Sequence, residues 1–244
     1  MDIPHYTTDL LKKNILAPDV LSLRFGRPLG FDFAAGQFIQ IHLPTQGTDA
    51  LRSFSLSSSP ADQHIELCAK LLPGGLASEF FKNMNIGDEL RFTGPRGQFT
   101  FRDDSDAHIF VAAGVGIAPI MSIIRDEIEY HVKPAESAGH VARKKTDKDI
   151  RLLFGVRSED DIFWQDRLDS LQSLSDRFSY HLTLSQPKAG GGWSGLRGHI
   201  TDHLLHHLID HEWYLCGGAG MVKDVRQQLL ANGVAKERVH FEIF

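Results

Sequence analysis

A short run near the middle of the chain constrains its fold more than any other feature. Residues 111–119 read Val-Ala-Ala-Gly-Val-Gly-Ile-Ala-Pro: an apolar stretch, two glycines one residue apart, and a proline that opens an amphipathic segment. His108 to Ala113 is typical of a buried parallel strand, and Pro119 suits the first turn of a helix, where its missing N–H costs nothing. Gly114 can adopt a conformation closed to residues with a Cβ atom, and Gly116 lets a ligand approach the backbone.

This run predicts a strand, a glycine turn and a helix that together bind the phosphates of a nucleotide. The third glycine of the usual dinucleotide fingerprint is absent, so a purely structural turn is the alternative.

Composition sets the number of domains and excludes some kinds of chemistry. The 244 residues, 42% of them apolar, suffice for one large domain or two modest ones. A net charge of −5 gives no electrostatic case for binding nucleic acid or an anionic membrane. The two cysteines, Cys68 and Cys216, are too few for an iron–sulfur cluster or a four-thiolate zinc site. The N-terminus lacks a leader pattern, and no stretch approaches the roughly eighteen apolar residues of a membrane span, so we expect a cytoplasmic protein.

Histidines are numerous, and three of them suggest a metal site. His203 and His207 lie one helical turn apart, with His206 between them, and such a pair can chelate zinc. No third ligand accompanies them, and residues 201–209 have the pattern of an ordinary amphipathic helix. We therefore expect a solvated cluster and no metal.

The spacing of apolar residues divides the chain into two parts. The first part alternates over 20–25, 37–43, 65–72 and 89–92, which predicts a small antiparallel barrel. The second part predicts parallel strands over 109–113, 151–156, 180–185, 213–216 and 239–244, with helices over 117–130, 161–174 and 222–230. An acidic stretch from Arg102 to Asp106 separates the patterns, so we expect a β domain over residues 1–103 and a Rossmann-like α/β domain over residues 104–244.

The barrel half contains two candidate anion sites. In Arg52-Ser53-Phe54-Ser55, Arg52 and Phe54 share one face of a strand. A guanidinium can hold a pyrophosphate with two hydrogen bonds, an aromatic ring can pack on a cofactor ring, and Ser55 can bond a heterocyclic nitrogen. Further along, Lys70 precedes the glycine turn Gly74 to Ser78, which opens a short helix and forms the second site.

The order of these motifs resembles that of the ferredoxin–NADP reductase superfamily, flavoproteins that join an FAD-binding barrel to a nicotinamide-binding α/β domain. The matching motifs are, in order, Arg52-Ser53-Phe54-Ser55, Cys68-Ala69-Lys70, Gly75-Leu76-Ala77-Ser78, Gly94-Pro95-Arg96-Gly97, Gly114 to Pro119, Cys216-Gly217-Gly218-Ala219-Gly220-Met221, and Glu242-Ile243-Phe244. The resemblance covers nearly the whole chain and includes no fused iron–sulfur domain.

The resemblance implies roles for particular residues. It implies that Arg52 and the turn from Gly74 to Ser78 bind the FAD pyrophosphate, that Phe54 packs beside the flavin, and that Ser55 contacts N5. It further implies that the catalytic residues are Ser55, Cys216, Glu242 and Phe244, with Cys216 near the hydride-donating carbon and Phe244 covering the flavin. Glu242 would help relay a proton or shape the site. The cofactor-binding residues are predicted to be Arg52, Ser53, Phe54, Ser55, Cys68, Ala69, Lys70, Gly74, Gly75, Leu76, Ala77, Ser78, Gly114, Val115, Gly116, Pro119, Arg157, Ser185, Gln186, Cys216, Gly217, Gly218, Met221 and Phe244.

Each catalytic assignment has a structural alternative. Cys216 ends an apolar strand and can be a small buried hydrophobe, Phe244 can complete the core of a sheet, and Glu242 can be a surface carboxylate. The sequence also departs from the family pattern: Phe54 replaces a tyrosine, Val115 a common threonine, and Gly217-Gly218 a common Gly-Pro.

The choice of nicotinamide nucleotide depends on residues after the second and third parallel strands. Relatives specific for NADPH often place an arginine where this chain has Gln186, which cannot pair with a 2′-phosphate. Arg157 could, but Glu159, Asp160 and Asp161 would oppose a phosphate if they faced the site. Their alternative role is capping, since Ser158 and Asp161 have capping-box spacing. We expect NADH rather than NADPH.

The predicted activity is hydride transfer from NAD(P)H to FAD, followed by electron transfer to a separate protein (ferredoxin, flavodoxin or an oxygenase component) or to a small acceptor. The reverse flow, from reduced ferredoxin to NAD(P)+, is equally open. The alternative is a flavin-binding electron-entry or redox-sensing subunit of a larger complex, with little activity alone. This alternative rests on the polar stretch 133–149. Its basic residues, Arg143, Lys144, Lys145 and Lys148, could dock an acidic carrier or simply be solvated.

Overall fold

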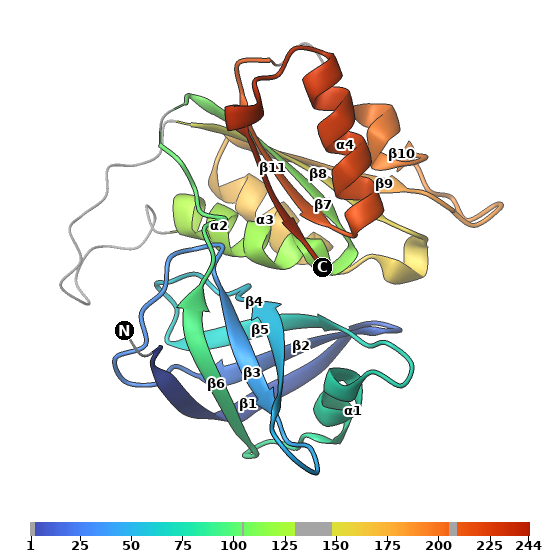
Figure 1. Cartoon of the computed structure of the whole chain (residues 1–244). Coiled ribbons are helices and arrows are strands. Elements are labelled where there is room, and N and C mark those ends of the chain that lie inside the picture. Colours follow the sequence, from blue (N-terminus) through green and yellow to red (C-terminus); the bar gives the residue numbers. More distant parts are fainter. Residues whose placement is uncertain (1–2, 104, 130–147, 205–208) are drawn as a thin grey trace.

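Two layers of sheet structure lie one above the other in the computed structural model, which describes residues 3–103, 105–129, 148–204 and 209–244 (Figure 1). The lower body is a barrel of six antiparallel strands in the order β4-β3-β6-β1-β2-β5. Its strands are β1 (His5–Ala17), β2 (Val20–Gly26), β3 (Phe38–Leu43), β4 (Ala50–Ser55), β5 (His64–Lys70) and β6 (Glu89–Arg96). A bridge between Leu56 and Leu67 connects the two ends of this order and closes the barrel.

The barrel forms because its strands alternate as a half-buried sheet requires. In β3, Ile39, Ile41 and Leu43 are fully buried, whereas the residues between them are partly exposed. The helix α1 (Leu76–Asn83) follows β5 and inserts Phe81 into the same core. The barrel therefore has its own apolar interior.

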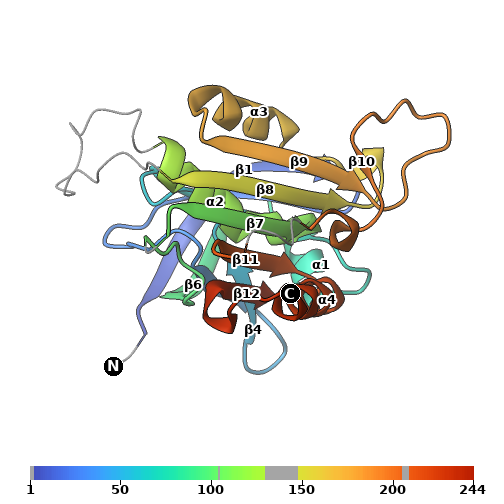
Figure 2. The same cartoon turned by 90° about the horizontal axis from the view of Figure 1, so that it is seen from above.

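The upper body is a parallel sheet of six strands in the order β10-β9-β8-β7-β11-β12 (Figure 2). The strands are β7 (Ala107–Ala113), β8 (Asp149–Val156), β9 (Phe178–Leu184), β10 (Leu196–Arg197), β11 (Glu212–Gly217) and β12 (Val239–Ile243). The helices are α2 (Ile117–Glu129), α3 (Gln165–Leu174) and α4 (Ala219–Ala231), and the 3-10 turns are η1 (Gly114–Gly116), η2 (Glu159–Asp161), η3 (Ile200–His203) and η4 (Lys236–Arg238).

Helices cover both faces of this sheet because its strands are apolar on both sides. In β7, Phe110 and Ala112 pack in the cluster that contains α2 and α3, whereas Ile109 and Val111 pack in the cluster that contains α4. Figure 1 shows α2 and α3 between the sheet and the barrel.

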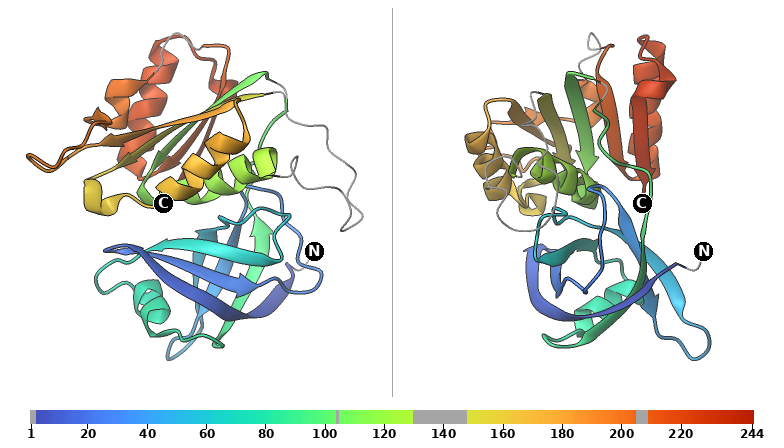
Figure 3. Two further views of the ribbon diagram at one scale, coloured as in Figure 1. Left: turned by 180° about the vertical axis from the view of Figure 1, so that it is seen from behind. Right: turned by 90° about the vertical axis from the view of Figure 1, so that its left-hand side faces the viewer.

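The two bodies share apolar and charged contacts. The cluster beneath the sheet includes Val20, Cys68 and Phe99 of the barrel half. Glu66 of β5 accepts two hydrogen bonds from Arg167 of α3, at 2.9 and 3.0 Å. Arg125 of α2 likewise pairs with Asp62, at 2.8 and 3.1 Å. The chain's C-terminus lies at this junction in both views of Figure 3.

The predicted fold class, an antiparallel barrel followed by a parallel α/β domain, is confirmed. Three elements were not predicted as strands from their apolar spacing: the 13-residue β1, the short β10, and β4, which was expected to be extended only from its Arg52 to Ser55 motif. In β1, register shifts on both sides of a Lys12-Lys13 pair interrupt the alternation. The helix predicted over 161–174 is η2 followed by α3, because Trp164 adopts a φ of 57° and interrupts it.

The helix predicted over 201–209 is wrong at its start, where Ile200–His203 is a 3-10 turn and Leu204 is extended. Residues 205–208, including His206 and His207, and most of the predicted basic connection lie outside the described residues. Within the part of the chain that the structure describes, no helix is long and apolar enough to cross a membrane.

Candidate functional site

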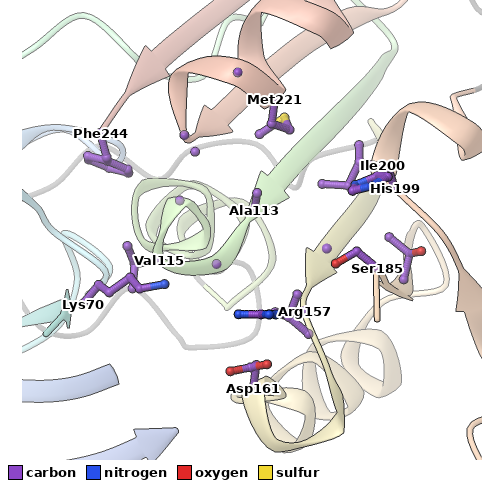
Figure 4. A pocket seen from close by; sticks show the side chains of 18 of the residues that line it. Lys70, Ala113, Val115, Arg157, Asp161, Ser185, His199, Ile200, Met221 and Phe244 are labelled. Atoms are coloured by element: carbon purple, nitrogen blue, oxygen red, sulfur yellow. The ribbon is translucent and has the colours of Figure 1, made fainter. Parts of the chain in front are cut away.

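A cavity of about 850 Å³ opens at the carboxyl ends of β7, β8, β9 and β11, the edge where parallel sheets bind ligands (Figure 4). The barrel contributes Lys70 and three neighbours to its wall. Ten residues predicted as site residues line it: Lys70, Gly114, Val115, Gly116, Arg157, Ser185, Gly217, Gly218, Met221 and Phe244. The glycine turn of the sheet and Lys70 of the barrel therefore meet at one cavity.

The glycine turn has the predicted shape, but its two glycines serve different purposes. Gly114 has a φ of +53°, in the left-handed region that favours glycine, and an added Cβ would meet open space. A Cβ on Gly116 would come within 2.3 Å of the Cys216 carbonyl oxygen. Gly116 is thus needed first for packing the turn against β11, a reason different from the predicted approach of a ligand. Pro119 lies in the first turn of α2 as predicted, but it is buried and does not line the cavity.

Cys216 lies behind the cavity wall rather than in it. Its side chain is fully buried in the cluster that contains α2 and α3. Burial raises the pKa of its thiol, and the charge of Glu242 adds to the effect. Its neighbour Gly217 lines the cavity and accepts a hydrogen bond from the N–H of Phe244 at 3.2 Å.

Ser55 and Glu242 come together although they lie in different domains. The Ser55 hydroxyl donates to Glu242 Oε1 at 2.7 Å and so joins the end of β4 to β12. Burial raises the pKa of the Glu242 carboxyl, and the bond from Ser55 offsets part of that rise. Phe244, two residues later, is half exposed and lines the cavity. The pair can hold and pass a proton beside the place where a ring would stack.

The remaining barrel motif fits a flavin dinucleotide. Arg52 and Ser53 are exposed on β4, where the Arg52 guanidinium bonds its neighbour's carbonyl. Phe54 contacts Phe81 of α1 edge to face at 5.1 Å, which sets β4 beside that helix. A cation, an aromatic ring and an uncapped helix N-terminus are what a pyrophosphate and a planar ring need.

The glycine turn before α1 differs in detail from its prediction. Gly74 has a φ of +68°. Gly75 is the N-cap residue of α1 and offers no side-chain cap, so N–H groups of the first turn, which begins with Leu76 and Ala77, stay open. The buried Ser78 hydroxyl accepts from the Leu72 N–H at 2.7 Å, so it holds the loop together. Cys68 and Ala69 are buried in β5, and burial raises the pKa of the Cys68 thiol.

The far end of the cavity contains Arg157, Ser185, Asp161 and His199. Arg157 Nε donates to the Gln186 side-chain oxygen at 2.9 Å. Asp161 accepts from both the N–H and the hydroxyl of Ser158, at 2.9 and 2.6 Å, which confirms the predicted capping box.

The other two acids of this segment turn away from the cavity. Glu159 accepts the Lys188 N–H, and Asp160 pairs with the Lys188 ammonium at 2.6 Å. Of the three acids that could oppose a 2′-phosphate, Asp161 is the one that lines the cavity.

Five polar residues of the cavity wall were not predicted: Asp19, Thr183, His199, Thr201 and Asp224. They belong to segments that carry no local binding motif, and they meet the glycine turn through the tertiary fold alone. Within the described ranges, no three His, Cys, Asp or Glu side chains gather as metal ligands. His203 Nε2 lies 2.9 Å from the Arg197 carbonyl oxygen.

Comparison with known proteins finds one family model in each half of the chain. Residues 7–101 match the model of the oxidoreductase FAD-binding domain, and residues 110–227 match that of the oxidoreductase NAD-binding domain. Ferredoxin–NADP reductase B of Sorangium cellulosum (strain So ce56) is 34% identical over 93% of this chain and 92% of its own length.

Two further similarities differ in extent. The reductase component of propane 2-monooxygenase from Rhodococcus jostii (strain RHA1) is 29% identical, and the chain spans 60% of that protein's length. The fold matches the crystal structure of a ferredoxin NADP+ reductase from Neisseria gonorrhoeae with bound FAD and NADP, with a TM-score of 0.82 and 22% identity over 99% of both chains. With both domain models matched in order around one cavity, the chain belongs to the ferredoxin–NADP reductase superfamily and is an NAD(P)H-dependent flavoprotein reductase that binds FAD and a nicotinamide nucleotide.

Proposed function

We propose that this chain takes hydride from NADH and passes the electrons to a separate protein carrier, an oxygenase component or a ferredoxin, in the cytoplasm. The observation that supports this most is the shared cavity: the glycine turn of the sheet, Lys70 of the barrel and Phe244 all line it. We also propose that the two domains meet at residues 103 and 104, in the segment between β6 and β7.

The residues of the chain would bind FAD, orient its ring and hold a proton near it. Arg52 and the uncapped first turn of α1 would hold the FAD pyrophosphate, and Phe54 would pack beside the ring. FAD supplies the ring system that accepts hydride when it is bound. Ser55 and Glu242 would hold the proton that this chemistry exchanges, and Phe244 would move aside to admit the nicotinamide.

The charges at the far end of the cavity favour NADH. Arg157 is held by the neutral Gln186, and the Asp161 carboxylate lines the same end. We expect Gln186→Arg to raise kcat/KM for NADPH about tenfold, because a charged hydrogen bond contributes roughly 1.5 kcal/mol or more. If NADPH is already the better donor of the unaltered protein, the NADH assignment is wrong.

Anaerobic stopped-flow mixing tests the hydride step. The purified protein, loaded with FAD, is mixed with NADH and separately with NADPH while the flavin absorbance is followed. We expect NADH to bleach the flavin rapidly. Bound flavin that neither nucleotide reduces would refute the reductase function.

The choice of acceptor rests on the similarity to reductase components and to a ferredoxin reductase. Reduced protein is mixed with a ferredoxin, with an oxygenase component and with ferricyanide. Reoxidation by ferricyanide alone would contradict a protein carrier. The alternative of a low-activity electron-entry subunit rests on a basic segment of which Lys148 is described, and that lysine pairs with Asp103 and Asp106 at 3.3 Å.

A further inference from the structure

The barrel places an ion pair in the wall of the nucleotide cavity. Lys70 is the last residue of β5, and Asp19 lies in the turn between β1 and β2. Lys70 Nζ is 3.3 Å from Asp19 Oδ2, and both residues line the cavity. The turn is anchored, because Val20 pairs with Lys70 in the sheet and the Leu71 N–H donates to the Asp19 carbonyl at 2.6 Å.

This pair is weak enough to exchange. The two side chains are 52% and 43% exposed, and ion pairs between exposed side chains contribute little to stability. Backbone contacts fix both residues at the cavity, but the lysine stem remains free to turn. Lys70 can therefore change partner at little cost.

Lys70 lies where a dinucleotide needs a cation. Figure 4 shows it on the same side of the cavity as Val115, and all three residues of that glycine turn, Gly114 to Gly116, line the cavity. Arg157, the other lysine or arginine of the described wall, is at the opposite end and is held by Gln186. The turn before α1, predicted as the flavin phosphate site, does not line this cavity. The position thus assigns Lys70 to the nicotinamide nucleotide rather than to FAD.

We propose that Asp19 and Lys70 form an exchangeable ion pair: Lys70 leaves Asp19 to bind the pyrophosphate of the nicotinamide nucleotide, and Asp19 takes it back when the nucleotide departs. The inference rests on the proposed function, in which this cavity binds that nucleotide. A pyrophosphate has two negative charges and competes well against one carboxylate. Asp19 then stands unpaired near the ligand, so it weakens binding and favours release.

The test measures nucleotide affinity in the FAD-loaded protein. NAD+ and ADP-ribose are titrated into the unaltered chain and into the variants Lys70→Gln, Asp19→Asn and the double variant. We expect Lys70→Gln to raise both Kd values about 5- to 10-fold, because one charged hydrogen bond is lost. We expect Asp19→Asn to lower them about 2- to 5-fold, the range that exposed charge pairs allow.

The double variant shows whether Asp19 affects nucleotide binding through Lys70 or acts on the nucleotide directly. Because Asp19 is proposed to act through Lys70, the double variant should bind as Lys70→Gln does. Lys82→Gln is the matched control: Lys82 pairs with Glu79 at 3.0 Å, is similarly exposed and lies outside the cavity wall. It should leave both affinities unchanged.

Several outcomes would overturn the exchange. They are an unchanged or weaker affinity in Asp19→Asn, effects that simply multiply in the double variant, and loss of FAD from Lys70→Gln with intact far-UV circular dichroism. Failure of the proposed function looks different, because the unaltered protein would then bind neither NAD+ nor ADP-ribose.

Discussion

Replacing Arg167 by Met should destabilise the protein by leaving a carboxylate buried without its partner. The Glu66 side chain is 2% exposed and accepts both hydrogen bonds of the Arg167 guanidinium, and Ser22 donates a third at 2.5 Å. Breaking a buried ion pair by removing one partner costs roughly 3–5 kcal/mol. Because Arg167 itself is 28% exposed, we expect the lower end, about 3 kcal/mol. For a chain of this length that corresponds to a fall in Tm of about 6–12 °C.

The loss should also depend on pH. Burial alone raises the pKa of Glu66, but the hydrogen bonds and charge of Arg167, with Ser22 and Arg24, lower it below its usual value. The carboxylate therefore stabilises the unaltered protein above its unfolded pKa of about 4.3, and that contribution is lost as the pH falls through the folded pKa. In Arg167→Met burial dominates and raises the pKa, so protonation relieves the cost as the pH falls. The difference between the two proteins should shrink from neutral toward acidic pH.

Urea unfolding of the FAD-loaded proteins at several pH values measures both effects. Arg177→Met is the control, since Arg177 pairs with Asp149 at 3.0 Å but both side chains are about half exposed. It should cost less than about 1 kcal/mol. If Arg167→Met loses no more stability than this control, or loses more at acidic than at neutral pH, the reasoning about Glu66 is refuted.

Further substitutions test the site. Ser55→Ala should slow flavin reduction by NADH about tenfold or more without loss of FAD, and should raise the pKa of Glu242 further, which a pH profile of the reduction rate detects. Gly116→Ala should destabilise by about 1–3 kcal/mol in urea unfolding, because its Cβ would meet the Cys216 carbonyl, whereas Gly220→Ala has open space and should not. Both cysteine thiols should resist a thiol reagent in the folded protein and react on unfolding, since both are buried and burial raises their pKa values; rapid labelling of the folded state would contradict this.

Strong periodicity made most of the parallel sheet predictable. The strand and helix around residues 108–129 follow the expected pattern, because two-sided burial gives an apolar run and the helix gives a 3.6-residue repeat. The prediction of strands and helices failed where an irregular backbone conformation interrupts the repeat of apolar residues. The register shifts in β1 and the left-handed Trp164 depend on tertiary packing, which no local pattern encodes.

The site was predictable where a motif is local and unpredictable where the cavity depends on distant segments. The glycine turn and the capping box have fixed spacing, and the structure contains both. Asp19 reaches the cavity because its turn pairs with the end of β5, and Asp224 does so from the second turn of α4. The purpose of Gly116 also needed the structure, because the backbone that it must approach is a hundred residues away in β11.

The apolar cluster beneath the parallel sheet draws Ala17, Val20, Ala35, Cys68 and Phe99 from the barrel half. These side chains belong to one interior, although two family models divide the chain between them. Cooperativity follows from such sharing: neither half can lose its packing without exposing apolar surface on the other. A cut near residue 103 would therefore leave two fragments, each with an exposed apolar surface. A chimera that carries a relative's barrel would need complementary apolar side chains at this interface to pack against α2 and α3.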